Sequence, residues 1–171
     1  LIFMDFENII IGTSSYDKVR SGNLVSITGD GGVAWNYFGS YYKKLAPRLV
    51  TYEKYMEGLE NLSNIKDKDE YQAYRSYIEY EYIKSYYETR LLNMDVYELL
   101  ETLYKKFGKE IILLCHEPIE EFCHRRVLAD YIELETGFYI PEVSIDESEK
   151  LIKENPIRYK KVINRVINER W

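Results

Sequence analysis

The chain has 171 residues, of which 46% are hydrophobic and 30% charged, and its formal net charge is -6. This length allows one domain with a full hydrophobic core and is short for two ordinary ones, so we predict a single domain over residues 1–171. The acidic balance argues against a general nucleic-acid binder, and no apolar run approaches the ~20 residues that a membrane span needs.

The N-terminal segment and the cysteine content indicate the compartment. Asp5, Glu7 and Asn8 interrupt the apolar residues of the first segment, which therefore lacks the basic start and the continuous apolar stretch of a signal peptide. Two cysteines cannot form a disulfide framework, which fits a reducing environment. We therefore expect a cytoplasmic protein that has no membrane segment.

Two short apolar runs near the N-terminus predict strands. Ile9 to Gly12 is typical of a buried strand, and the following Thr13 to Ser15 is expected to form a polar loop. Leu24 to Thr28 predicts a second strand, and the glycines of Gly29 to Gly32 predict a turn. This glycine-rich turn is not a dinucleotide-binding fingerprint, because it lacks the G-x-G-x-x-G spacing.

The middle of the chain has helical composition. Thr51 to Gly58 and Asp67 to Asn93 contain no proline and few β-branched residues. Many of the eighteen tyrosines of the chain lie in this region. Tyrosine suits helix packing, interfaces and base stacking alike, and for aromatic residues at helical spacing we favour packing within and between helices.

The clearest elements follow in the order helix, strand, helix. Asp95 to Gly108 is an amphipathic pattern with an N-cap residue and a terminating glycine. Glu110 to Cys115 is continuously apolar, as in a strand buried on both faces, and Val127 to Ile132 begins a second amphipathic pattern that Gly137 closes. This order predicts an α/β fold: three layers, a mostly parallel sheet with flanking helices, a Tyr-rich helical insertion and C-terminal helices.

The C-terminal part, about residues 144–171, is predicted to be a helical extension. Phe138 to Ile140 reads as a last short strand, and Ser144 to Glu147 has the capping-box pattern that predicts a helix to about Lys153. A final helix is expected from Asn155-Pro156 to the end of the chain. The last fifteen residues hold five basic residues and one glutamate, which fits a solvated basic face or a surface for an acidic partner.

Every cysteine and histidine of the chain lies in the segment LCHEPIEEFCHRR, residues 114–126. Cys115 is expected at the carboxyl end of a parallel strand, where such sheets present ligand-binding loops. Cys123, His124 and Arg125 fall in the first turn of a helix, whose unpaired N–H groups attract anions and stabilise a thiolate. The segment predicts an anion or phosphate site with a nucleophilic thiol, and the alternative is two cysteines that are simply packed.

Two other chemistries fit the spacing less well. Zinc could use Cys115, His116, Cys123 and His124, but the seven-residue gap exceeds that of zinc knuckles, and neighbouring residues on a strand point to opposite faces. A cysteine-dependent phosphatase loop needs an arginine six residues after its cysteine, and those positions hold Glu121 and Ala129. We therefore assign no metal ligand, and the sequence leaves the cofactor unknown.

The same segment resembles a known family. Leu113 to Glu117, followed by Phe122 to Arg126 and Ala129, is similar to the "LLC-x-E … FCHR" signature of the family catalogued as domain of unknown function 488. Tyr41 to Pro47 resembles its "Y-x-x-LAP" segment, and Gly12 to Tyr16 its "TS" loop. The resemblance covers roughly residues 10–143. It implies a compact α/β domain of bacteria and archaea that has no assigned reaction.

The chain departs from this family at two places. Relatives tend to carry an arginine and a proline after the second strand, where this chain has GDGGVAW, and a small or aromatic residue where it has His116. The first departure removes a cation from the predicted site. The final helices lie outside the resemblance.

The leading hypothesis is a cytoplasmic protein whose strand-end cleft binds a small anionic, nucleotide-like ligand and acts on it as a hydrolase or transferase. The candidate catalytic residues are Cys115, Cys123, His124 and Glu117, and the candidate ligand-binding residues are Arg125, Arg126, Thr13, Ser14 and Trp35. The alternative is a non-catalytic module that holds a protein or a nucleic acid through the basic C-terminal helix and the Tyr-rich insertion.

Overall fold

The computed structural model describes residues 4–171 and divides them into two compact units. The first unit joins the chain up to Ala46 with Met94–Lys160, and the second joins Pro47–Asn93 with Lys161–Trp171. No helix among the described residues is both long and apolar enough to cross a membrane.

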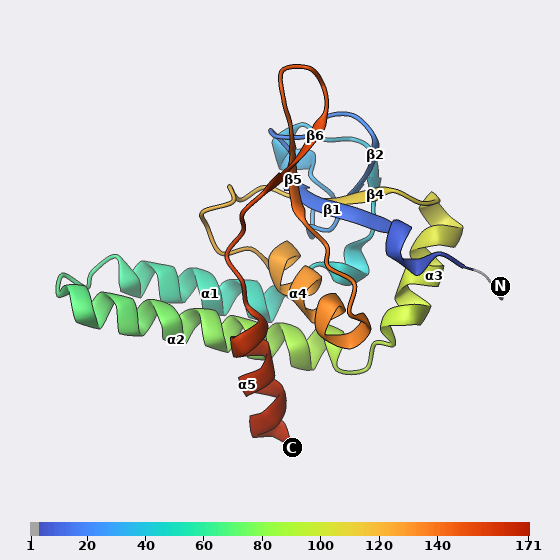
Figure 1. Cartoon of the computed structure of the whole chain (residues 1–171). Helices are drawn as coiled ribbons and strands as arrows, with labels where there is room; N and C mark the ends of the chain where they lie inside the picture. The colour runs from blue at the N-terminus through green and yellow to red at the C-terminus, as the bar shows by residue number, and fades with distance from the viewer. Residues whose placement is uncertain (1–3) are drawn as a thin grey trace. The chain divides into compact units, whose positions relative to one another are not determined.

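The first unit is built around a six-stranded sheet in the order β3-β2-β4-β1-β5-β6. Figure 1 labels these strands apart from the short β3. Its strands are β1 (Ile10–Ser15), β2 (Asn23–Ser26), β3 (Ser40–Tyr41), β4 (Ile111–Cys115), β5 (Glu142–Ile145) and β6 (Leu151–Glu154). All neighbouring strands are parallel except β5 and β6. The predicted α/β class with a mostly parallel sheet and flanking helices is therefore confirmed.

The central strand and the helices on either side of it in the sequence form where the apolar pattern predicts them. All five residues of β4 are buried. α3 (Val96–Phe107) begins after Asp95, whose side chain accepts the Glu98 N–H, and it ends at Gly108. α4 (His124–Thr136) ends at Gly137, whose φ of 82° is a left-handed conformation that glycine adopts without strain. Strand β4 and helix α4 therefore fix the two ends of residues 114–126, which we call the Cys/His segment.

The first strand extends further than the sequence indicates. Thr13 to Ser15 were expected in a loop, but they belong to β1 and pair with Leu113 to Cys115 of β4. Their hydroxyl groups are tolerated inside the sheet because each has a partner: Ser14 Oγ, for example, donates to the Val143 carbonyl at 2.6 Å. The polar residues therefore continue the strand to the sheet edge that carries Cys115.

Two expectations for the C-terminal part are wrong. Phe138 to Ile140 form no strand, and Ser144 to Glu147 open no helix; a β5–β6 hairpin occupies this region (Figure 1). Asp146 accepts the N–H groups of Ser148 and Lys150, so the side chain expected inside a capping box closes a tight turn instead. The last helix, α5 (Lys160–Arg170), begins later than expected.

Gly12 allows β5 to lie close against β1. A Cβ atom at this position would lie 2.8 Å and 2.9 Å from the two methyl groups of Val143, which is a stiff, buried side chain. We expect Gly12→Ala to lower the free energy of unfolding by about 1–3 kcal/mol, the usual cost of overpacking. Urea unfolding measures this loss, and Gly29→Ala is the matched control because its Cβ would meet nothing within 4 Å. Equal stabilities of the two variants would contradict the prediction.

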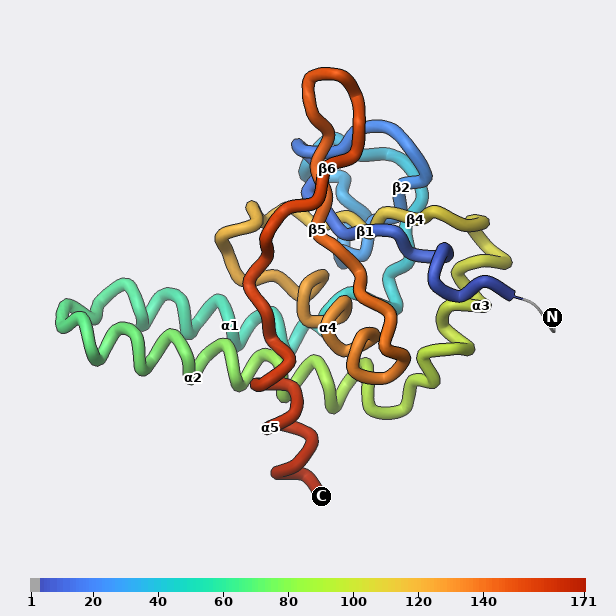
Figure 2. Tube along the Cα trace, viewed as in Figure 1, coloured from blue at the N-terminus to red at the C-terminus, as the bar shows by residue number. Residues whose placement is uncertain are grey.

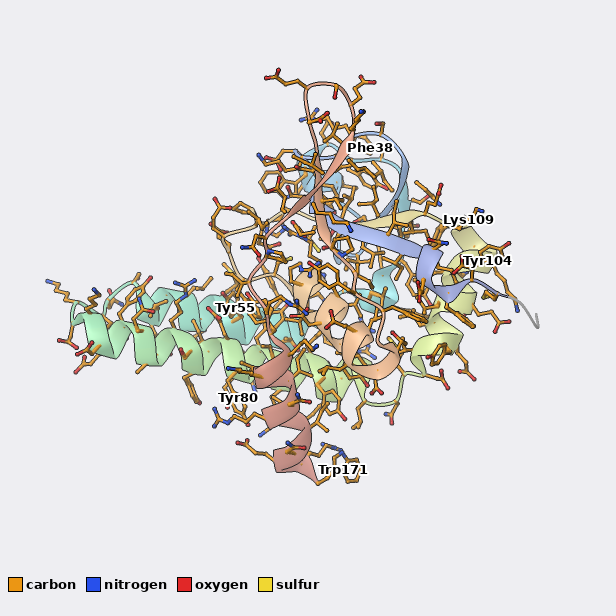
Figure 3. All side chains as sticks on the ribbon, in the orientation of Figure 1. Phe38, Tyr55, Tyr80, Tyr104, Lys109 and Trp171 are labelled. Atoms are coloured by element: carbon orange, nitrogen blue, oxygen red, sulfur yellow. The ribbon has the colours of Figure 1, made fainter. Side chains whose placement is uncertain are left out.

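The second unit contains an antiparallel helical hairpin of α1 (Leu49–Leu62) and α2 (Lys68–Tyr86), which run side by side in Figure 2. A π-helical turn, η4 (Tyr87–Leu91), continues α2. Tyrosine rings pack between these helices, as the sequence predicts: Tyr55 meets Tyr82 edge-on at 5.2 Å between ring centroids (Figure 3 labels Tyr55). The Tyr-rich insertion is thus a packed helical pair.

Short 3₁₀ turns complete the elements of the first unit: η1 (Phe6–Asn8), η2 (Val33–Trp35) and η3 (Lys43–Leu45). Turn η2 follows the predicted glycine-rich turn, and Gly32 precedes it with a φ of 91°. Asp30 closes this turn by accepting the N–H groups of Gly32 and Ala34. The loop after β2 is therefore ordered by its own polar groups, and it brings Trp35 to the carboxyl edge of the sheet.

Candidate functional site

Two thiols and an imidazole converge at the carboxyl edge of the sheet. Cys115 is the last residue of β4, Cys123 is the N-cap of α4 and His124 is the first residue of that helix. Their ligand-type atoms all lie within 4.8 Å of one another. All three side chains are buried, with at most 5% of each residue exposed. The cluster is therefore held by a strand end and a helix start, both rigid elements.

A backbone carbonyl orients the His124 ring. His124 Nε2 lies 2.7 Å from the Ile27 carbonyl oxygen, so we assign the ring proton to Nε2, which donates to that oxygen. Nδ1 then carries the lone pair, and it lies 3.9 Å from Cys115 Sγ and 4.0 Å from Cys123 Sγ. Cys115 Sγ lies closer to Nε2, at 3.4 Å, so the ring contacts Cys115 through both nitrogens and Cys123 through Nδ1.

The two thiols differ in their expected charge. Burial raises the pKa of Cys115 well above its usual value, so this thiol stays neutral. Burial also acts to raise the pKa of Cys123, but a hydrogen bond from the Cys115 thiol and the charge of the Arg125 guanidinium outweigh it and lower that pKa well below its usual value. Cys123 is therefore the thiolate of the pair.

Glu117 adds a carboxyl group beside Cys123. Burial and the nearby Cys123 charge raise the pKa of Glu117 to about 9, so the carboxyl group holds its proton at neutral pH in the absence of a bound cation. His116 Nε2 lies 3.1 Å from Glu117 Oε1, and the His116 ring stacks on Trp35 with 5.3 Å between centroids. Trp35 is 53% exposed. The stacked pair therefore links the carboxyl group to solvent.

A buried ion pair holds Arg125. Its Nη2 donates to Glu142 Oε2 at 2.7 Å and its Nε to Glu142 Oε1 at 3.1 Å, a two-pronged contact that fixes the plane of the guanidinium. Thr13 Oγ1 donates to the same carboxylate at 2.6 Å and accepts from Arg126 Nη1 at 2.8 Å. Sequence reasoning did not assign Glu142 to the site, although Ile140 to Val143 resembles the end of the family pattern and Glu142 is the carboxylate of that stretch.

Unsatisfied polar atoms gather on three residues of the Cys/His segment. Among residues 4–171, the buried side-chain nitrogen and oxygen atoms that have no hydrogen-bond partner are Glu117 Oε2, Arg125 Nη1, Arg126 Nε and Arg126 Nη2. Native structures contain few such atoms, and those at a functional site usually meet a ligand, an ion or water. Within residues 4–171, these unpartnered atoms are therefore concentrated in this segment.

The structure brings together five of the predicted site residues and separates the others. Cys115, Glu117, Cys123, His124 and Arg125 form one neighbourhood. The hydroxyl groups of Thr13 and Ser14 are instead bonded to Glu142 and to the Val143 backbone, and Arg126 is bonded to Thr13 and the Ile140 carbonyl. Thr13, Ser14 and Arg126 thus support the sheet behind the cluster, and Trp35 lies at its exposed side.

A comparison with protein families gives one match. The family described as "Domain of unknown function DUF488" matches residues 44–132, slightly more than half of the chain. The chain belongs to this family. No curated protein and no solved structure matches it.

The DUF488 match contains the whole Cys/His segment and excludes several of its supports. Cys115, Glu117, Cys123, His124 and Arg125 lie inside the matched residues, which end at 132. Residues Thr13, Trp35 and Glu142 lie outside them. The resemblance noted from the sequence is confirmed as a family relationship over this span.

Proposed function

We propose that this DUF488 protein binds a small anionic, nucleotide-like substrate at the Cys/His segment and acts on it by hydrolysis or group transfer. The observation that carries the proposal is the set of unpartnered buried atoms, which includes a guanidinium N–H group of Arg125 and a carboxyl oxygen of Glu117. The Arg125 N–H group is a donor that suits an anionic oxygen, and the Glu117 carboxyl group can exchange a proton.

Arg125 is the proposed anion-binding residue. Glu142 engages its Nε and Nη2 atoms and leaves Nη1 without a partner, so one edge of a rigid guanidinium is presented to a ligand. Glu142 is accordingly a positioning residue, because it fixes the orientation of Arg125. An Arg-bound phosphate or carboxylate would gain a charge-assisted hydrogen bond in a site that excludes water.

Glu117 is the proposed proton carrier. In the proposed reaction, the oxygen of water or of an acceptor hydroxyl forms a bond to the electrophilic atom of the substrate. The bond to the leaving group breaks, and the leaving group keeps the electron pair and takes the proton of Glu117. The proton from the attacking oxygen returns to the Glu117 carboxylate. Cys115, Cys123 and His124 line the reacting position beside it.

The burial of these groups requires movement before a substrate can reach them. Cys123 and Arg125 are 2% and 1% exposed, whereas the Glu117 side chain is 22% exposed and lies next to the His116–Trp35 stack. Both stacked rings are exposed to solvent: Trp35 is 53% exposed and the His116 side chain 39%. An aromatic ring in that position also suits a planar base of a nucleotide-like ligand.

The basic C-terminal residues do not favour the alternative of an interaction module. Arg158 pairs with Asp130 and Glu133, and Lys160 also contacts Glu133. Further along α5, Arg165 pairs with Glu169, and Arg170 pairs with Glu88. Four of the five basic residues predicted as a binding face are thus already neutralised by carboxylates of the chain.

The proposal predicts that anions perturb Arg125. In a protein labelled with ¹⁵N-arginine, titration with inorganic phosphate should shift the Nε–H resonance of Arg125 in a saturable way, because phosphate supplies the missing acceptor for Nη1. Arg158, whose side chain is 43% exposed, provides the internal control for surface binding. If phosphate and sulfate move the Arg158 resonance and leave that of Arg125 unchanged, the proposal is overturned.

A further inference from the structure

The geometry points to a mononuclear zinc site formed by Cys115, Cys123 and His124, with a fourth coordination position open toward Glu117. The inference stands on the convergence of three ligand atoms within 4.8 Å and is independent of anion binding. Zinc prefers thiolate sulfur and imidazole nitrogen, and catalytic zinc sites commonly have three protein ligands and one exchangeable position.

The distances between the donor atoms fit tetrahedral coordination. Typical zinc–sulfur and zinc–nitrogen bonds, joined at a tetrahedral angle, separate the sulfur and nitrogen atoms by about 3.6 Å. His124 Nδ1 lies 3.9 Å and 4.0 Å from the two sulfur atoms. Contraction by a few tenths of an ångström, which a bound cation would itself cause, is enough to complete the coordination.

The contacts of the histidine match those of a metal ligand. A ligating histidine usually donates its second ring N–H to a carbonyl or carboxylate, which fixes both its tautomer and its orientation. His124 Nε2 makes this contact with the Ile27 carbonyl at 2.7 Å. The hydrogen bond leaves the lone pair on Nδ1, which lies 3.9 Å and 4.0 Å from the two sulfur atoms. Cys115 Sγ lies nearer to Nε2, at 3.4 Å, so a shared cation would draw the Cys115 side chain toward Nδ1.

The spacing argument against zinc counted His116 as one of four ligands. In the structure the His116 ring stacks on Trp35 and its Nε2 contacts Glu117, so this histidine lies outside the cluster. The gap between the two cysteines is bridged by a strand end and a helix start that return to the same point. The spacing of these residues therefore disfavours a four-ligand zinc knuckle but is compatible with a three-ligand site.

Glu117 gives the open position a chemical role. Its Oε2 atom is buried and has no hydrogen-bond partner, and its Oε1 atom lies 3.1 Å from His116 Nε2. This unpartnered oxygen is an acceptor that could hold a water molecule bound at the fourth position, and zinc would make such a water more acidic. If the proposed function is also correct, this water supplies the attacking oxygen.

Metal binding can be measured on the whole chain without a substrate. We expect the reduced, chelator-treated protein to bind one Zn²⁺ or Co²⁺ per chain. The Co²⁺ form should show sulfur-to-cobalt charge transfer and the intense visible bands of tetrahedral coordination. Cys115→Ser, Cys123→Ser and His124→Gln should each weaken binding by at least ~100-fold, because loss of a ligand costs no less than loss of an outer partner.

His116→Gln is the matched control, because it replaces the neighbouring histidine that lies outside the cluster, and it should leave Co²⁺ affinity and spectrum unchanged. Circular dichroism confirms that each variant is folded, and the wild-type spectrum tests the site even where a variant fails to fold. Octahedral Co²⁺ bands, the absence of stoichiometric binding, or an equal loss in His116→Gln would overturn the zinc site. These readouts separate it from the anion test, which uses chelator-treated protein and follows Arg125.

Discussion

Replacing Glu142 with leucine is expected to lower the free energy of unfolding by about 3–5 kcal/mol, because it removes the carboxylate that is hydrogen-bonded to the buried Arg125 guanidinium. The two side chains are 1% and 4% exposed, and their closest contact is 2.7 Å. The substitution also removes the acceptor of the Thr13 hydroxyl. Urea unfolding followed by circular dichroism measures the loss.

Two further variants test whether loss of the Arg125–Glu142 ion pair causes the lower stability of Glu142→Leu. Replacing both partners, Arg125→Met with Glu142→Leu, should recover part of the lost stability, since two apolar side chains of similar size remove both charges of the pair. Removing the exposed Lys105–Glu101 pair with Glu101→Gln should change stability little. A double variant that is less stable than Glu142→Leu alone would mean that lost packing, rather than the isolated Arg125 charge, dominates.

Leu114→Ala is expected to cost about 2–5 kcal/mol, the range measured for large-to-small changes in tightly packed cores. Leu114 is fully buried and belongs to the cluster of Tyr16, Val19, Ile112 and Val143. Because β4 is held between β1 and β2 by ladder hydrogen bonds, the strand cannot collapse into the cavity that the substitution leaves. The midpoint of urea unfolding should fall accordingly.

The matched control for this change is Leu151→Ala. Leu151 lies on the edge strand β6 and is 45% exposed, so its truncation should shift the midpoint far less. Similar shifts of the unfolding midpoint for both variants would show that the centre of the sheet tolerates truncation. That result would contradict the view that β4 holds Cys115 rigidly. The pair therefore also tests whether the strand that carries the candidate ligand is held by its core.

Local sequence patterns correctly predicted the strand and helices that have a clear apolar pattern. β4 is apolar at every position, and α3 and α4 combine an amphipathic stripe with a capping residue or a terminating glycine. In such segments the sequence pattern and the tertiary environment favour the same conformation. The order of these elements was sufficient to predict the mostly parallel sheet and to place Cys115 at its carboxyl edge.

Prediction from local sequence patterns failed where a short pattern is compatible with two different conformations. Ser144 to Glu147 fits a capping box, but Asp146 can accept N–H groups in a tight turn equally well, and pairing with β6 decides the outcome. Thr13 to Ser15 read as a loop because their hydroxyl groups need partners. Those partners, including Glu142 and Val143, come from a strand more than a hundred residues later.

For the candidate site, the sequence by itself determined the chemistry and the approximate place: two thiols, a histidine, a glutamate and an arginine between a strand end and a helix start. Only the tertiary structure decided which of them meet. It brought the His124 ring within 4.0 Å of both sulfur atoms, stacked His116 on Trp35, and paired Arg125 with Glu142. The reason is physical: the direction of a side chain depends on the carbonyls, carboxylates and rings supplied by distant strands, and spacing along one segment does not contain them.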